Sequence, residues 1–169
     1  MKQKIAAVLA VLMLAFSQLA AAAGINQISA DDHVLQNDEI ALGGIMVGTP
    51  RSEVEAIYGA PTERTEPVKG AMFGEMMDTY TYGTSFQVIF VKDTAMYVIT
   101  TAHNGIATPA GVRVGDPADA VMRTYGKPHR YTQNESGKES FVYRDAREVA
   151  IVFSAENGVI TRIGIVGAE

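Results

Sequence analysis

The stretch of sequence that decides the fold is GIMVGTPRSEVEAIYGAP, residues 44–61, because it recurs as GVRVGDPADAVMRTYGKP, residues 111–128. The two stretches align without a gap at an offset of 67 residues. Identical residues occupy the pairs Gly44/Gly111, Val47/Val114, Gly48/Gly115, Pro50/Pro117, Val54/Val121, Tyr58/Tyr125, Gly59/Gly126 and Pro61/Pro128. Self-similarity at a fixed period is typical of a duplicated structural unit. The sequence therefore predicts two diverged copies of one unit.

Each copy predicts one short helix. Thr49 and Asp116 are good N-cap residues, and each is followed by a proline, which suits the first helical position. Gly59 and Gly126 suit the left-handed residue that ends a helix, and a proline two positions later prevents the helix from resuming. We therefore expect two helices of about two and a half turns.

Both predicted helices carry an apolar stripe that must be buried, because so short a helix is unstable without packing. The stripes consist of Val54, Ile57 and Tyr58 in the first copy, and of Val121, Met122 and Tyr125 in the second. We expect the rings of Tyr58 and Tyr125 to be mostly buried, in equivalent places.

The helices are expected to pack on antiparallel strands. Apolar and polar residues alternate in residues 79–82, 86–91 and 96–101, and again in 141–144, 149–154 and 159–166. Lys92-Asp93-Thr94 and Glu156-Asn157-Gly158 read as hairpin turns. The predicted fold class is α+β, with two tandem helix-plus-antiparallel-sheet repeats at 39–105 and 106–169, joined in one sheet with the helices on one face. Residues 39–46 are expected to form one more strand or an ordered arm.

The N-terminus predicts export. Lys2 and Lys4 precede an apolar run at residues 5–16, and three alanines at 21–23 offer a signal-peptidase site. The run is too short to span a bilayer. We expect residues 1–23 to be a cleaved signal peptide, residues 24–38 a flexible leader, and the mature protein to be periplasmic or secreted, without a lipid anchor or membrane insertion.

Composition excludes several classes of protein. The chain has 14 basic and 19 acidic side chains, and loss of Lys2 and Lys4 with the signal would leave a net charge of −7. An acidic protein is a poor ligand for nucleic acid. Without cysteine it can form neither disulfides nor thiolate sites. The sequence carries no recognisable catalytic or phosphate-binding motif, so we expect neither an enzyme nor a cofactor.

The Gly-x-Pro or Gly-Thr-Pro start, short helix, Tyr-Gly-x-Pro and following strands resemble the BamE (SmpA/OmlA) superfamily of bacterial envelope proteins. Residues 47–61, 114–128 and 153–163 carry that match. A tandem pair of such units is also similar to the β-lactamase inhibitory protein. The resemblance implies a sheet whose open face is placed on a partner protein.

Three methionines, Met72, Met76 and Met77, cluster in residues 70–78. Thioethers select monovalent copper, which makes a copper site one interpretation. The alternative is that methionine fills an irregular gap where the loop folds back on the core.

The sheet face away from the helices is the other candidate site. Its polar positions are expected at Thr79, Thr81, Gln87, Arg144 and Arg162, mixed with apolar Ile89, Val91 and Val152. Such a face is either an ordinary solvated one or an interface. The leading hypothesis is a non-catalytic module of the bacterial cell envelope that docks a protein partner through this face. The alternatives are a periplasmic small-ligand or copper handling protein, and an inhibitor of a secreted hydrolase that inserts residues 66–77.

Overall fold

The computed structural model describes residues 26–27, 34–69 and 74–168. Its centre is one antiparallel sheet of ten strands. Nine strands follow the order β1-β7-β8-β9-β10-β6-β5-β4-β2, and β3 pairs with β4 beside β2. The strands are β1 Asn26–Gln27, β2 Glu63–Arg64, β3 Val68–Lys69, β4 Met76–Tyr82, β5 Phe86–Val91, β6 Thr94–Thr100, β7 Arg130–Gln133, β8 Lys138–Arg144, β9 Ala150–Glu156 and β10 Val159–Val166.

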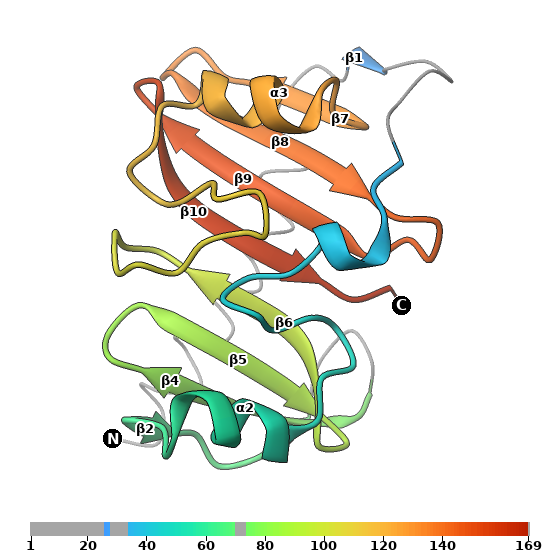
Figure 1. Ribbon diagram of the computed structural model, residues 1–169, viewed down its shortest axis with the longest axis vertical. Coiled ribbons are helices and arrows are strands. Elements are labelled where there is room, and N and C mark those ends of the chain that lie inside the picture. Colours follow the sequence, from blue (N-terminus) through green and yellow to red (C-terminus); the bar gives the residue numbers. More distant parts are fainter. Residues whose placement is uncertain (1–25, 28–33, 70–73, 169) are drawn as a thin grey trace.

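Strands from both ends of the chain meet at the middle of the sheet. Strand β6 pairs with β10, from Ile163 opposite Thr100 to Val166 opposite Tyr97. On either side of this pair the strands follow one another as antiparallel neighbours, in mirrored order. The prediction of a single antiparallel sheet is thereby confirmed, and Figure 1 shows the two halves lying side by side.

The described helices are α2 Arg51–Tyr58, α3 Asp119–Tyr125 and the 3-10 helix η1 Asn37–Glu39. All three lie on the same side of the sheet, which we call the first face (Figure 1). The described fold is therefore mostly β, with two short α-helices. The predicted α+β class is correct only in that short helices lie on one face of an antiparallel sheet. The strands missed from the sequence are the short outer ones, β1, β2, β3 and β7, which have too few residues to show a period.

The helix starts correct the predicted caps. Helix α2 begins after Pro50 and helix α3 after Ala118, and neither N-cap has a side-chain hydrogen bond. The Thr49 hydroxyl instead accepts a hydrogen bond from the Met46 amide. The Asp116 carboxylate accepts one from the amide three residues before it in the same way. These side chains close the turn before each helix because a local turn competes with the helix for the same acceptor.

The predicted helix ends are confirmed in position, but the two glycines do not adopt the left-handed helical conformation expected of them. Gly59 and Gly126 have φ of 75° and 73°, with ψ of −157° and −149°, a conformation that in practice only glycine adopts. Their amides donate to the carbonyls of Glu55 and Met122. The hairpin turns are confirmed as well, since Lys92, Asp93, Asn157 and Gly158 all have positive φ.

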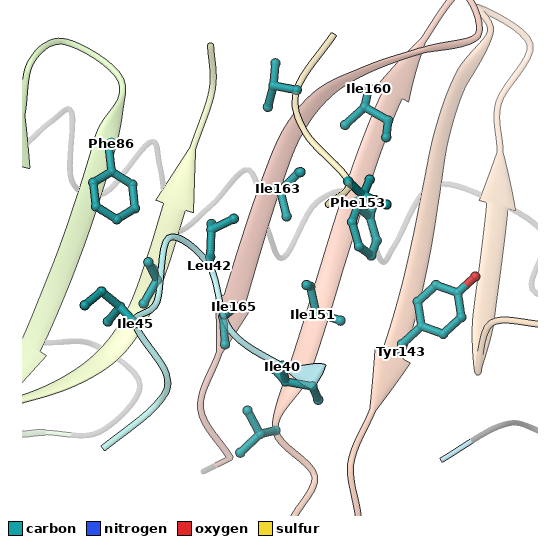
Figure 2. Close-up of a cluster of buried hydrophobic side chains, with 14 of the residues drawn as sticks. Ile40, Leu42, Ile45, Phe86, Tyr143, Ile151, Phe153, Ile160, Ile163 and Ile165 are labelled. Carbon is teal, nitrogen blue, oxygen red and sulfur yellow. The ribbon is translucent and has the colours of Figure 1, made fainter. Parts of the chain in front are cut away.

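The main core lies between the first face and the segments that cross it (Figure 2). Ile40, Leu42 and Ile45 come from the predicted arm and are at most 1% exposed, against Ile151 and Ile165 of the sheet. The arm is ordered, as expected, but forms only isolated bridges. Packing, rather than ladder pairing, holds it across the sheet.

The end of the expected leader is also fixed to the fold. Leu35 is 2% exposed, and its amide donates to the Arg144 carbonyl. Asn26–Gln27 pair with β7. Residues 24–25 and 28–33 of the leader and the whole predicted signal, residues 1–23, lie outside the described residues.

The two tyrosines differ in burial. Tyr125 is 3% exposed, and its hydroxyl donates to the Thr108 hydroxyl at 2.7 Å. Tyr58 is half-buried, and its hydroxyl donates to the Gly43 carbonyl at 2.5 Å. The expectation of mostly buried rings therefore fits Tyr125 well and Tyr58 only in part.

Candidate functional site

The sheet face opposite the helices, which we call the second face, is made by every other residue of each strand. The pairing register shows how these residues line up across the sheet. One row runs through Arg144, Ala150, Val166, Tyr97, Ile89 and Thr79. The next runs through Arg130, Val142, Val152, Gly164, Ile99, Gln87 and Thr81. Both rows cross from the C-terminal half of the sheet into the N-terminal half.

The centre of the second face is apolar. A hydrophobic cluster separate from the main core consists of Met77, Ile89, Val91, Tyr97 and Ile99, all buried, with Met96 and Val166 packed against it. Every member belongs to the sheet, so in the described part of the chain no helix contributes to this cluster. The five buried members are only 1–7% exposed, so they form a second buried cluster on this face and not an exposed apolar patch.

The rim of the second face is polar, and its charge is uneven. Over strands β7 to β10 the rim carries the basic residues Arg130, Lys138 and Arg144, and Arg162 lies half-buried on β10, nearer the middle of the sheet. In the same region Glu148 pairs with Arg144, and Glu156 pairs with Lys138. Burial lowers the pKa of the Arg162 guanidinium. In a third row, which ends at Arg162, the residues that precede it are Thr132, Ser140 and Ser154, and all three carry hydroxyl groups.

A single buried hydroxyl lies within the apolar centre. Thr79 is 1% exposed, and its Oγ1 has no hydrogen-bond partner among the described residues. Leaving a buried hydroxyl unpaired costs about 1–3 kcal/mol.

The five site residues expected from the sequence share the second face but fall into separate groups. Thr79, Thr81 and Gln87 are neighbours on β4 and β5, where the Gln87 amide donates to the Thr81 hydroxyl at 3.5 Å. Arg162 lies on β10 and is half-buried. Arg144 lies on β8, at the opposite end of its row from Thr79, and is exposed. The sequence analysis missed Tyr97 and Arg130, although both follow the same alternation.

The suggested copper ligands do not converge. Met76 and Met77 are successive residues of β4, so their side chains point to opposite faces of the sheet. Met76 is 54% exposed and Met77 is 1% exposed, within the apolar cluster. Met72 lies outside the described residues. The structure thus favours the alternative interpretation of Met77 as a packing residue.

The first face carries a second polar cluster, which the sequence analysis also missed. Arg51 binds Asp78 through two hydrogen bonds of 2.7 and 2.9 Å and Asp93 through one of 2.8 Å. Its guanidinium also lies over the rings of Tyr80 and Phe90, at 4.7 and 4.2 Å from their centroids. Burial works to lower the pKa of Arg51, but the hydrogen bonds outweigh it, so that pKa is raised.

This Arg51 cluster joins the start of α2 to the sheet and to its edge. Arg64 of β2 contacts the same Asp78 carboxylate at 3.2 Å, and the Tyr80 hydroxyl donates to Glu55 of α2. Every charge of the cluster has a partner, so its geometry explains how the helix is held. Only the long-range pairing of β4 brings Asp78 to Arg51, which is why no local pattern could reveal it.

Two searches of the described residues gave no site of another kind. No helix there is long and apolar enough to cross a membrane. No three His, Cys, Asp or Glu side chains there group closely enough to hold a metal ion.

No protein-family model matches the sequence, and no curated protein matches it significantly. Several solved structures are similar in fold, among them the following three. A DUF4309 family protein, YjgB, from Bacillus subtilis has a TM-score of 0.45 and 15% identity, covering 74% of this chain and 83% of its own. An extracellular protein containing an SCP domain from Bacillus anthracis has a TM-score of 0.49 and 8% identity. A cysteine-rich secretory protein from Staphylococcus aureus has a TM-score of 0.48 and 10% identity.

The matches with the last two proteins cover 83% of this chain but only 50% and 51% of theirs, so this chain spans about half their length. The comparisons correct the resemblance suggested by the sequence. The similar structures are a DUF4309 protein and secreted bacterial proteins, and not the BamE superfamily or the β-lactamase inhibitory protein. The motif failed because Gly, Pro and Tyr at a helix end describe a local capping geometry, which unrelated folds share.

Proposed function

We propose that this protein is an exported, non-catalytic binding module of the bacterial cell envelope that docks a protein partner through the second face. The observation that carries the proposal is the group of half-buried apolar side chains on that face, Val142, Val152 and Val166, which lie beside the buried Met77, Ile89, Val91, Tyr97 and Ile99 cluster and are bordered by polar and charged side chains. An apolar centre within a polar rim is the anatomy of a protein-binding surface. The apolar start of the sequence supports export.

A duplication would explain how such a face arose. We infer that two copies of a helix-plus-strands unit are joined through β6 and β10. Support comes from the mirrored strand order and the matching turns at Thr49 and Asp116. The Tyr82 and Tyr143 hydroxyls also each donate to the glycine that ends a helix, Gly59 and Gly126. The second face has diverged between the halves, since the apolar cluster lies mainly on β4 to β6 and the basic rim on β7 to β10.

Site-specific photo-crosslinking in living cells tests the docking function. A benzophenone amino acid is placed at Gln87 or Val152, both half-buried on the second face, and at Arg123, exposed on α3, as the matched control. We expect a discrete protein adduct from the two second-face positions and none from the control. Adducts that are absent from all three positions, or equal in all three, would contradict the proposal.

A further inference from the structure

Asparagine followed by glycine occurs twice in the chain, at Asn104-Gly105 and at Asn157-Gly158, and both pairs are exposed. Asparagine is a thermolabile residue. Its side-chain amide is lost when the backbone nitrogen of the next residue attacks Cγ, and a glycine in that next position leaves the attack unhindered because it has no Cβ. The two pairs are therefore alike in sequence and in exposure, and their hydrogen bonds distinguish them.

The Asn104 side chain is held at both of its polar atoms. Its Nδ2 donates to the Ser85 and Thr100 hydroxyls at 3.0 and 3.1 Å. Its Oδ1 accepts a hydrogen bond from the Ile106 amide at 3.1 Å. These bonds fix the carboxamide and must break before Cγ can meet the Gly105 nitrogen, so the fold protects this asparagine.

The Asn157 side chain is not held in this way. It makes no hydrogen bond within the described part of the chain, and neither does the Gly158 amide. Both residues have positive φ, 53° and 75°, at the tip of the β9–β10 hairpin. Ring closure requires the backbone to leave this turn conformation, which an exposed hairpin tip can do by local opening.

We propose that Asn157 is a spontaneous deamidation site of this protein and that Asn104 is protected from the same reaction. The Gly158 nitrogen bonds to Asn157 Cγ while its proton passes through solvent to Nδ2, which leaves as ammonia. Water then opens the cyclic imide at either carbonyl and leaves aspartate or isoaspartate at position 157. The net reaction consumes water, releases ammonia and is accelerated by base.

The same turn supports the start of α3. The Gly158 carbonyl accepts a hydrogen bond from the Ala118 amide at 2.8 Å, and Val159 forms a bridge with Pro117. Isoaspartate routes the main chain through the former side-chain carbonyl and so lengthens it by a methylene group just before Gly158. The product should therefore loosen the first turn of α3, a consequence that does not depend on the docking function.

The test incubates the mature protein at mildly alkaline pH, in buffer and in urea, and follows both asparagines by peptide mapping with mass spectrometry. In buffer, Asn157 should deamidate several-fold faster than Asn104. In urea the two rates should become similar, because the protecting hydrogen bonds are gone. Similar rates in buffer would overturn the proposal, and so would an unchanged preference in urea, which would assign the difference to the local sequence.

A variant tests the protection directly. Ser85→Ala removes one acceptor of the Asn104 amide and should raise the rate at Asn104 in buffer, while the rate at Asn157 in the same sample serves as the matched control. Circular dichroism verifies that the variant is folded. An unchanged rate at Asn104 would overturn the role given to its hydrogen bonds.

Hydrogen exchange tests the structural consequence. The isoaspartate form, separated by ion exchange, should exchange the Ala118 amide several-fold faster than the unmodified protein. Asn157→Asp is the matched control, because it adds the charge without lengthening the main chain. Equal exchange in the isoaspartate form and in this control would overturn the link between the turn and α3.

Discussion

Replacing Asp78 by asparagine tests the main electrostatic tie between α2 and the sheet. Asp78 is 5% exposed and holds Arg51, whose side chain is 15% exposed, through two hydrogen bonds. The substitution removes the charge that balances this guanidinium. Breaking a buried pair from one side costs about 3–5 kcal/mol. Because Asp93 remains bound to Arg51, although its side chain is 83% exposed, we expect about 3 kcal/mol.

The matched control is Asp119→Asn on α3, where both Asp119 and Arg123 are more than half exposed. Exposed pairs of this kind contribute at most about 0.5 kcal/mol. The measurement is urea unfolding followed by far-ultraviolet circular dichroism, since the chain has no tryptophan. Asp78→Asn should lower the midpoint by about 1–2 M. A shift no larger than that of Asp119→Asn would refute the reasoning.

A double-mutant cycle separates the ion pair from other effects of the substitution. If Arg51→Met with Asp78→Leu is more stable than Asp78→Asn alone, the cost of the single change lies in the orphaned guanidinium, as buried pairs replaced by apolar groups often show. If the double variant is less stable than either single variant, the rings of Tyr80 and Phe90 depend on the guanidinium itself.

Three further predictions concern tyrosines and one glycine. Tyr125→Ala should cost about 3–4 kcal/mol in urea unfolding and Tyr58→Ala less, because Tyr125 is buried and Tyr58 is half-buried; equal costs would contradict this. Gly43→Ala should cost about 2–3 kcal/mol, because the new Cβ would lie 2.3 Å from the Tyr58 hydroxyl. In the control, Gly44→Ala, the new Cβ meets nothing within 4 Å, and the change should cost about 1 kcal/mol. Similar shifts of the thermal midpoint in the two variants would argue against a clash. Burial and Glu139 raise the pKa of Tyr131 to about 12, so its share of stability is complete below pH 10 and is lost as the pH rises from 10 to 12. Tyr131→Phe should therefore lose less stability than the wild type between pH 9 and 12 in urea titrations, and an identical pH profile would contradict the assignment.

The sequence was informative where neighbouring residues decide the structure. The helix ends at Gly59 and Gly126 and the turn at Asn157 followed from conformations that few residues can adopt. The strands at 86–91 and 159–166 appeared with the expected bounds, because alternation over six to eight residues is a strong signal. The same alternation assigned Thr79, Thr81, Gln87, Arg144 and Arg162 to one face.

Local patterns misled where side chains had a choice of partner. Thr49 and Asp116 suit a helix cap and a turn equally well, and only the built structure shows that they close the turn before the helix. The family resemblance rested on the same short motifs and failed for the same reason. A capping motif records the geometry of a few residues, whereas a family is defined by how the elements are arranged.

Long-range pairing was decided by the tertiary structure alone. The junction of β6 with β10 brings together Ile99 and Gly164, which are 65 residues apart in the chain, and so makes one continuous second face. The tie between Arg51 and Asp78 and the unpaired hydroxyl of Thr79 depend on the same non-local contacts. The sequence by itself determined the helix ends, the hairpin turns and the alternation of the strands, because each depends on residues within one element. Which strands meet, which charges pair and where the apolar rows run depend on packing between distant elements, so only the folded chain decides them.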